Sequence, residues 1–172
     1  DMHQYMVGRQ LHNEYYREAR QAAPADKVLV EARNLGRTGA FRNVSFTLRA
    51  GEVLGIAGVI GSGREDLARC LAGHMPADSG TLTVDGKSVR FTSVPQAAAQ
   101  GVGLVPAERK IEGLVAQFSV AENMTLAALP KYVSGGVLNF AAERETAKAW
   151  IDRLKIKTPS ANAMVGGDRK ST

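Results

Sequence analysis

The feature that most constrains the fold of this chain is a glycine-rich loop between an apolar run and a helical pattern. The apolar run covers residues 53–57, the loop covers residues 58–65, and the helical pattern continues to Leu71. A strand, a glycine loop and a helix in this order are typical of a loop that wraps its backbone N–H groups around an anion at a helix N-terminus. We therefore expect a strand–loop–helix unit with room for a phosphate group.

The loop keeps the glycine spacing of a phosphate-binding loop and changes its last two residues. The full pattern is Gly, four residues, Gly, Lys and then Ser or Thr, whereas Arg64 and Glu65 occupy the last two positions here. Arg64 keeps the positive charge of Lys, although a planar guanidinium does not replace a compact ammonium freely. Glu65 replaces the hydroxyl that binds Mg²⁺ in an intact loop, and Asp66 adds a second negative charge. We expect nucleotide binding weaker than in an intact loop, and slow or absent hydrolysis at this loop.

The candidate binding residues are those of the loop and of the first turn of the helix. Glycines allow the backbone to approach the phosphates closely, and the helix start adds the positive end of its dipole. The expected donors are the N–H groups of Ser62, Gly63 and Arg64. The alternative is a tight strand-to-helix turn without a ligand, in which the acidic residues only stabilise the helix start. The set contains no catalytic residue and no metal ligand, and it consists of Gly58, Gly61, Ser62, Gly63, Arg64, Glu65 and Asp66.

Length and composition are those of an ordinary globular protein and exclude several other classes. The chain has 172 residues, of which 44% are hydrophobic and 23% are charged. No apolar run approaches the roughly 20 residues of a membrane span, and residues 1–20 lack the apolar block of a signal peptide. Cys70 is the single cysteine, which excludes an intramolecular disulfide and favours a reducing compartment. The net charge of +5 comes from dispersed basic residues, so nucleic acid is not expected as a partner.

The first half of the chain is expected to be rich in strands. An alternating pattern predicts a strand over residues 44–48, which follows a strand over 28–32. Non-alternating apolar runs over 53–57 and 102–105 predict strands buried on both faces of a parallel sheet. The remaining expected elements are a helix over 64–71 that stops at Gly73, a hairpin with strands 81–84 and 88–91 around residues 85–87, and a short helix over 95–100.

The second half is expected to be helical. Ser119 and Glu122 form a capping box at the start of a helix that ends near Pro130. A second helix starts near Asn139, and we interpret Trp150 on its apolar stripe as a core anchor rather than as a ligand-stacking ring. Residues 108–110 are predicted to be either a ligand or interface loop or a solvated turn. His3, His12 and His74 show no metal-ligand spacing and are predicted to be surface residues.

These elements together predict an α/β fold in which antiparallel strands lie beside a parallel core and a helical insert. We expect three parts along the chain. Residues 1–26 form a lead-in or linker, residues 27–166 form the main domain, and residues 167–172 form a disordered tail.

At this level of detail the chain resembles an ATP-binding cassette domain of the P-loop NTPase type. More narrowly, it resembles the second cassette of the two-cassette ATPase subunits of bacterial ribose, galactose and xylose-type importers, in which Arg often replaces the Lys of the Walker A loop. The resemblance covers residues 6–166. It rests on the residue stretches 6–9, 51–58, 79–81, 85–87, 103–110, 112–114, 119–123 and 156–160.

The resemblance implies a nucleotide-binding domain that uses ATP and Mg²⁺, both bound weakly or not at all by the isolated chain. It implies sugar permease subunits and the other cassette of the same subunit as partners, with residues 106–114 and 119–130 as the contact surfaces. The intact subunit would be a peripheral ATPase on the cytoplasmic side of the inner or plasma membrane, whereas this chain alone is expected to be soluble and inactive. The alternative is a non-catalytic interaction module that does not bind nucleotide by itself.

The chain departs from the family pattern at three places. Leu35, with Phe41 nearby, stands where a cassette usually has an aromatic residue that stacks on adenine. Ala107, followed by Glu108, replaces the usual glutamine. No Leu-Ser-Gly-Gly signature, Walker B carboxylate or switch histidine follows Gly166. The resemblance thus implies about two-thirds of a cassette, with uncovered apolar faces that favour self-association into a homo-oligomer.

Overall fold

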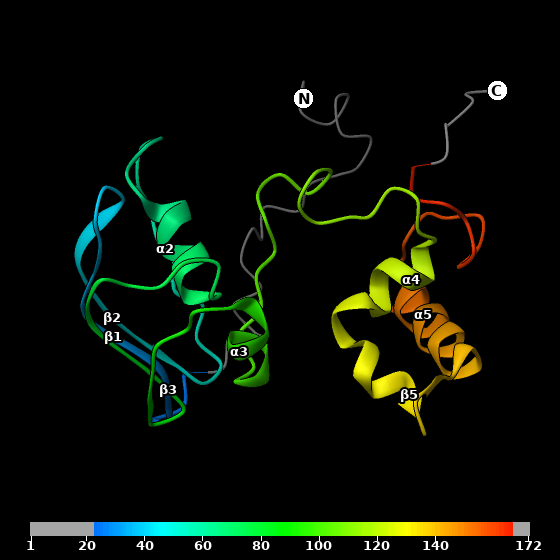
Figure 1. Ribbon diagram of the computed structural model, residues 1–172, viewed down its shortest axis with the longest axis horizontal. Helices are drawn as coiled ribbons and strands as arrows, with labels where there is room; N and C mark the ends of the chain where they lie inside the picture. The colour runs from blue at the N-terminus through cyan, green and yellow to red at the C-terminus, as the bar shows by residue number, and fades with distance from the viewer. Residues whose placement is uncertain (1–22, 167–172) are drawn as a thin grey trace. The chain divides into compact units, whose positions relative to one another are not determined.

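The structure is a computed structural model that describes residues 23–166. Two compact units divide the chain, one up to Leu104 and the other from Val105 (Figure 1). Most of the lead-in predicted over residues 1–26, and the whole tail predicted over 167–172, lie outside the described residues.

The first unit is built on a four-stranded antiparallel sheet with the strand order β2-β1-β3-β4. Strand β1 (Val28–Arg37) pairs with β2 (Phe41–Arg49) on one side and with β3 (Ser79–Val84) on the other. Strand β4 (Lys87–Val89) pairs with β3 across a tight turn. The central position of β1 explains why it is longer than expected, because neighbours on both sides hold its N–H and C=O groups.

Local sequence signals account for most of this unit. Residues 44–48 alternate between half-buried and exposed positions, as predicted for a strand with one apolar face. The turn between β3 and β4 has positive φ at Asp85 (47°) and Gly86 (78°), as a two-residue hairpin with this sequence requires. The predicted hairpin is confirmed, although β4 ends before Phe91, which turns into the core instead.

Two helices pack on the core of this unit. Helix α2 (Arg64–Leu71) begins and ends where the sequence predicts. Gly73 has φ 81° and closes the helix, because His74 N–H donates to Arg69 C=O at 2.9 Å and Gly73 N–H donates to Cys70 C=O at 3.1 Å. Helix α3 (Val94–Ala99) is the predicted short helix and has proline in its first turn. The core consists of Ala32, Leu35, Phe41, Leu67, Cys70, Leu82, Val84, Phe91 and Ala97.

The two buried parallel strands predicted over residues 53–57 and 102–105 are wrong for the described chain. Neither run is a strand, and Val53 and Val105 are 96% and 91% exposed. The physical reason is that a strand needs hydrogen-bonding neighbours, whereas every strand in residues 23–166 pairs with an antiparallel partner and none pairs with these runs. The antiparallel subdomain of the α/β prediction is therefore present, and the parallel core is not formed among these residues.

The second unit consists of helices and one small hairpin. Helix α4 (Val120–Thr125) continues into the 3₁₀ helix η2 (Leu126–Tyr132), so the predicted helix end at Pro130 falls inside η2. A hairpin not predicted from the sequence, β5 (Val133–Ser134) and β6 (Val137–Leu138), leads into helix α5 (Phe140–Leu154). The predicted start of this last helix is confirmed, since the Asn139 side chain caps it by accepting from Ala142 N–H at 3.1 Å.

Polar contacts fix the start of α4 and its packing on α5. The predicted capping box is present, with Ser119 N–H donating to Glu122 Oε2 at 2.7 Å and Glu122 N–H donating to Ser119 Oγ at 3.2 Å. The Thr125 hydroxyl contacts the Glu143 carboxylate, and both groups are buried between the helices. A buried carboxyl with a hydroxyl partner specifies one pairing of the two helices, because any other pairing leaves it without that partner.

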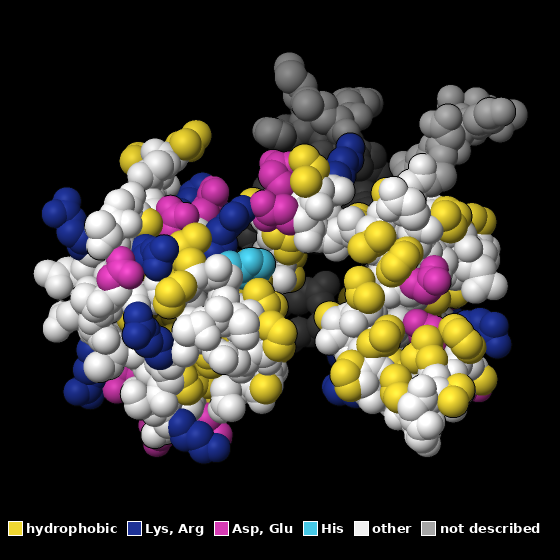
Figure 2. Space-filling model, viewed as in Figure 1, with side chains coloured by type: hydrophobic (Ala, Val, Ile, Leu, Met, Phe, Trp, Pro, Cys, Tyr) yellow, Lys and Arg dark blue, Asp and Glu magenta, His cyan; other side chains and the backbone are white. Residues whose placement is uncertain are grey.

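The interpretation of Trp150 as a core anchor is wrong for this unit. Its side chain is 41% exposed, and the Arg153 guanidinium lies 4.8 Å from its ring centroid. Of the apolar stripe Ala147, Trp150, Ile151 and Leu154, only Ala147 is fully buried, because α5 packs only against the short helices α4 and η2 among the described elements. Apolar side chains consequently remain on the surface of this unit (Figure 2), among them Val137, Phe140 and Leu154.

Candidate phosphate-binding site

The glycine loop leads directly into helix α2, as the sequence predicts. Gly61 and Gly63 have φ values of 81° and 82°, in the left-handed region that favours glycine. Gly63 is the N-cap residue, and no side chain caps the helix. The helix start is therefore open to an external acceptor.

The N–H groups at this helix start provide the chemistry of the site. Within residues 23–166, the backbone N–H groups of residues 63–66 have no hydrogen-bond partner, whereas Ser62 N–H donates to Val59 C=O at 3.1 Å. One of the three predicted donors is thus used by a turn inside the loop. The other two, Gly63 and Arg64, remain available together with the N–H groups of Glu65 and Asp66. Unpaired N–H groups at a helix N-terminus attract anions.

The side chains of the loop fold back onto its first residue. Arg64 Nη1 donates to Gly58 C=O at 3.1 Å. A methyl group on Gly58 would overlap with the Ser62 hydroxyl. The structure therefore brings together Gly58, Ser62 and Arg64, whereas a methyl group on Gly61 would meet nothing within 4 Å.

Of the two acidic residues in the first turn of α2, Glu65 lies beside the Arg64 guanidinium. Glu65 Oε1 is 4.0 Å from Arg64 Nη2, and both side chains are largely exposed. Asp66 is half-buried on the same turn. Within the described residues, no group of three or more His, Cys, Asp or Glu side chains is arranged to hold a metal. Two adjacent carboxylates can contribute to Mg²⁺ coordination only if phosphate oxygens and water complete the shell.

The turn between β1 and β2 lies beside the loop, a contact that no sequence pattern predicted. A methyl group on Gly63 would overlap with the Ala40 carbonyl group, so the turn and the loop are in close contact. The turn also lines a hollow of about 650 Å³ with residues 36–42, Asp78 and Ser79. That volume lies within the roughly 300–1,000 Å³ of small-molecule sites. The contact joins residues far apart in the sequence, which is why periodicity and motif spacing did not reveal it.

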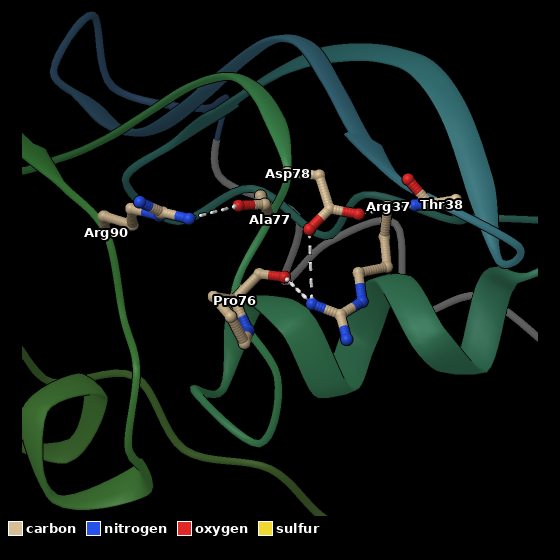
Figure 3. A network of polar contacts seen from close by, with 6 residues as sticks. All are labelled: Arg37, Thr38, Pro76, Ala77, Asp78 and Arg90. Atoms are coloured by element: carbon tan, nitrogen blue, oxygen red, sulfur yellow. Dashed lines mark hydrogen bonds and ion pairs between the residues drawn. The ribbon is translucent and has the colours of Figure 1, made fainter.

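Asp78 is the anionic residue beside the β1–β2 turn (Figure 3). Its carboxylate accepts from Thr38 N–H at 2.7 Å and lies 3.4 Å from Arg37 Nη1. The pKa of Asp78 is lowered, chiefly by the Thr38 N–H and side chain, while partial desolvation opposes the shift and the charges of Arg37 and Arg90 add to it. Asp78 is therefore an anion at neutral pH.

Leu35 and Phe41, considered above for adenine contact, both belong to the core. Leu35 is buried beneath the sheet, and Phe41 is buried at the start of β2. Neither presents an open aromatic face to a base.

Other predicted features lie apart from the glycine loop along the chain. The run Glu108–Lys110 forms an exposed turn closed by Glu112 N–H donating to Glu108 C=O at 2.8 Å. His74 is exposed as predicted, while His3 and His12 lie outside the described residues. Burial raises the pKa of the Cys70 thiol, which is a protonated core group at neutral pH. Among the described residues, no helix is both long enough and apolar enough to span a bilayer.

Comparisons with known proteins agree on one family. The sequence profile of ABC transporters matches residues 41–171. Ribose import ATP-binding proteins are similar over most of this chain. One from Pseudomonas putida is 43% identical over 144 residues, which are 84% of this chain and 28% of the relative. Another, from Geobacillus kaustophilus, is 37% identical over 171 residues, which are 97% of this chain and 34% of the relative. The chain thus spans about a third or less of the length of these relatives.

Solved structures show the same fold. A dimeric ATP-binding cassette in a post-hydrolysis state with ADP and phosphate matches with a TM-score of 0.62 and 19% identity, over 79% of this chain and 61% of that chain. A nucleotide-free cassette from an ABC transporter matches with a TM-score of 0.57 and 20% identity, over 82% of this chain and 59% of that chain. At these identities the likeness concerns the fold.

Proposed function

The chain belongs to the ABC transporter family, and from this premise we propose that it is a nucleotide-binding part of the ATPase subunit of a sugar importer. More narrowly, we propose that it corresponds to the second cassette of such a subunit, with an altered Walker A loop in the domain over residues 27–166. The names of the relatives, which describe ribose import, support the substrate class. In the assembled transporter this part would help to couple ATP binding and hydrolysis to sugar uptake.

The observation that carries the proposal is the row of unpartnered N–H groups over residues 63–66 at the start of α2. These groups, with the Arg64 guanidinium, match the negative oxygens of a polyphosphate in charge and in donor number. Residues Gly58, Gly61, Ser62, Gly63 and Arg64 would contact the phosphates. Glu65 and Asp66 would lie near Mg²⁺, whose charge offsets that of the phosphates.

The altered residues explain why we expect the binding to be weak. Arg64 must give up its hydrogen bond to Gly58 C=O before its guanidinium can reach a phosphate. The carboxylates of Glu65 and Asp66 repel phosphate oxygens until a cation screens them. The first effect stabilises the ligand-free chain and the second destabilises the complex, so both reduce the affinity for ATP without removing the donors of the helix start.

We infer from the same family membership that the partners are permease subunits and the other cassette of the subunit. The protein would then be peripheral, on the cytoplasmic side of the membrane. Residues 106–114 and 119–130 are proposed as contact surfaces, and exposed apolar side chains such as Ile111, Leu114 and Leu126 support this. Apolar side chains on a surface are typical of protein interfaces.

The experiment that tests nucleotide binding is calorimetry of the full chain with Mg-ATP at low salt. Wild-type protein should bind with a dissociation constant in the micromolar to millimolar range. The Arg64→Ala variant should bind at least about tenfold more weakly, as expected for loss of a charge-assisted hydrogen bond. Arg64→Lys should retain binding. Arg33→Ala, which removes an exposed cation from β1, is the matched control and should bind like wild type.

The second candidate function is a non-catalytic interaction module. The observation in its favour is that the Arg64 side chain donates to Gly58 C=O. This carbonyl group therefore has a hydrogen-bond partner without a ligand. An absence of heat at millimolar Mg-ATP, in a sample with a folded circular dichroism spectrum, would support the module and refute the nucleotide site.

A further inference from the structure

We propose that Asp78 is a positioning residue that holds the β1–β2 turn against the glycine loop and thereby shapes the part of the nucleotide site beyond the phosphates. The inference rests on the proposed nucleotide binding and adds to it a residue outside the loop. Asp78 would act through the turn, because both of its carboxylate oxygens are already engaged by protein groups.

The first step is the clamp on the turn itself (Figure 3). Asp78 Oδ2 accepts from Thr38 N–H at 2.7 Å, and Asp78 N–H donates to Gly36 C=O at 2.8 Å. The segment after α2 therefore binds the end of β1 and the start of the turn at two points. A hydrogen bond from a backbone N–H to a carboxylate is stronger than one to a neutral acceptor.

The second step is the support of Asp78. Arg37 Nη1 donates to Pro76 C=O at 2.8 Å and also pairs with Asp78 Oδ1 at 3.4 Å. From the other side, Arg90 Nη2 donates to Ala77 C=O at 3.3 Å. Two cations, one at the end of β1 and one directly after β4, thus contact the three residues 76–78. Rotation of the carboxylate away from Thr38 would also break its contact with Arg37 Nη1.

The third step is the contact through which the position of the turn affects the glycine loop. Ala40 N–H donates to Arg37 C=O at 3.0 Å and closes the turn. The Ala40 carbonyl then lies so close to Gly63 that a methyl group there would not fit. Gly63 is the N-cap residue of α2. A displacement of the β1–β2 turn would therefore change the protein surface beside a ligand bound at the start of α2.

The fourth step concerns the hollow beside the β1–β2 turn. Residues of the turn, Asp78 and Ser79 line the same space of about 650 Å³. Ala40 lines this hollow and also contacts Gly63, and through this one residue the hollow adjoins the start of α2, so the proposal places the nucleoside of a nucleotide bound at residues 63–66 there. The positioning of the turn should therefore affect the nucleoside and leave the phosphates unaffected.

The test compares two probes on the full chain by calorimetry, Mg-ATP and Mg-tripolyphosphate. Asp78→Ala should weaken ATP binding by about threefold to tenfold, the range that follows from loss of one hydrogen bond. Tripolyphosphate affinity should change by less than about twofold, within calorimetric scatter, because the helix start is intact. Asp78→Asn should recover part of the loss, since its amide oxygen still accepts from Thr38 N–H.

Asp85→Asn is the matched control. Asp85 lies in the turn between β3 and β4, pairs with Lys27 at 2.6 Å and contacts neither the turn nor the loop of the site. This variant should bind both probes like wild type. Should Asp78→Ala fail to fold, the same comparison is made with Asp78→Asn alone, for which a smaller but selective loss of ATP affinity is expected.

Equal weakening of both probes in the Asp78 variants would mean that Asp78 only supports the fold, and it would overturn the inference. Unchanged binding of both probes would overturn it as well. Wild-type protein that binds neither probe would instead refute the proposed function, and the inference would fall with it. Wild-type protein that binds both probes with equal affinity would show that the hollow holds no nucleoside and would overturn the inference while leaving the phosphate site intact.

Discussion

Replacement of Gly63 by alanine should destabilise the first unit far more than the same replacement at Gly61. The two glycines share the left-handed backbone, with φ 82° and 81°, so they share the conformational cost of a side chain there. They differ in surroundings, because an added methyl group at Gly63 would overlap with the Ala40 carbonyl, while one at Gly61 has nothing within 4 Å. The pair therefore separates the contact from the backbone conformation.

The structure sets the expected loss of stability for each variant. An alanine in the left-handed region costs about 1–2 kcal/mol, and that is the full expected loss for Gly61→Ala. At Gly63 the overlap forces the turn or the helix to shift, which adds about 1–3 kcal/mol. The free energy of opening should fall by a total of about 2–5 kcal/mol for Gly63→Ala, a factor of roughly 30 or more in the population of open molecules.

Cys70 provides the assay, because it is the single thiol of the chain and is only 4% exposed in the core of the same unit. A thiol reagent labels it only after the unit opens, so the labelling rate at low reagent concentration reports the open fraction. Gly61→Ala should raise the rate by about fivefold to thirtyfold, and Gly63→Ala should raise it by at least a further fivefold.

Equal rates for the two variants would refute the contact between the glycine loop and the β1–β2 turn. Gly55→Ala is a suitable third variant, since Gly55 has no left-handed φ and an added methyl group there would meet nothing within 4 Å. It should leave the labelling rate close to that of wild type.

Three further predictions concern charge, capping and exposure. The pKa of Asp78 is lowered, so its stabilising contribution is present above the ordinary carboxyl pKa and is lost as pH falls through the lowered value. Asp78→Asn removes this titration, and it should therefore flatten the acid limb of a pH–stability profile measured through Cys70 labelling. Ser119→Ala removes the capping box and should destabilise the second unit by about 1 kcal/mol in urea unfolding followed by Trp150 fluorescence, whereas Ser134→Ala should not. Trp150 emission should be red-shifted and quenched by acrylamide in the native protein, and a blue emission resistant to quenching would contradict its exposed position.

The sequence predicted well those features whose causes are local. The capping box at Ser119, the helix start after Gly63 and the stop at Gly73 each depend on residues within one turn of the chain. The same holds for the hairpin at Asp85 and Gly86. Such signals act through short-range hydrogen bonds and steric limits on φ, so they survive whatever the rest of the chain does.

The predictions that failed depend on partners distant in sequence. Residues 53–57 are apolar enough for a buried strand, but apolar character does not provide the neighbouring strand that its backbone requires. Trp150 lies on an apolar helical stripe, but the stripe does not reveal how much of it neighbouring helices cover. The contact of Ala40 with Gly63 and the clamp of Asp78 on Thr38 were missed for the same reason, since each joins segments more than twenty residues apart.

The glycine loop itself divides into a supported half and an unsupported half, and this division bears on how it binds. Residues 58–61 follow a run without strand pairing, and Ile60 is 97% exposed. Gly63, in contrast, is held by helix α2 itself, because Leu67 N–H donates to Gly63 C=O at 2.8 Å. The donors that face an anion at residues 63–66 therefore keep their arrangement without the first half of the loop. Because a preorganised donor set loses less entropy on binding than a mobile one, most of the phosphate affinity should come from the N-terminus of α2. Substitution of Gly58 should then affect ATP binding less than substitution of Arg64, and the reverse order would show that the first half of the loop dominates.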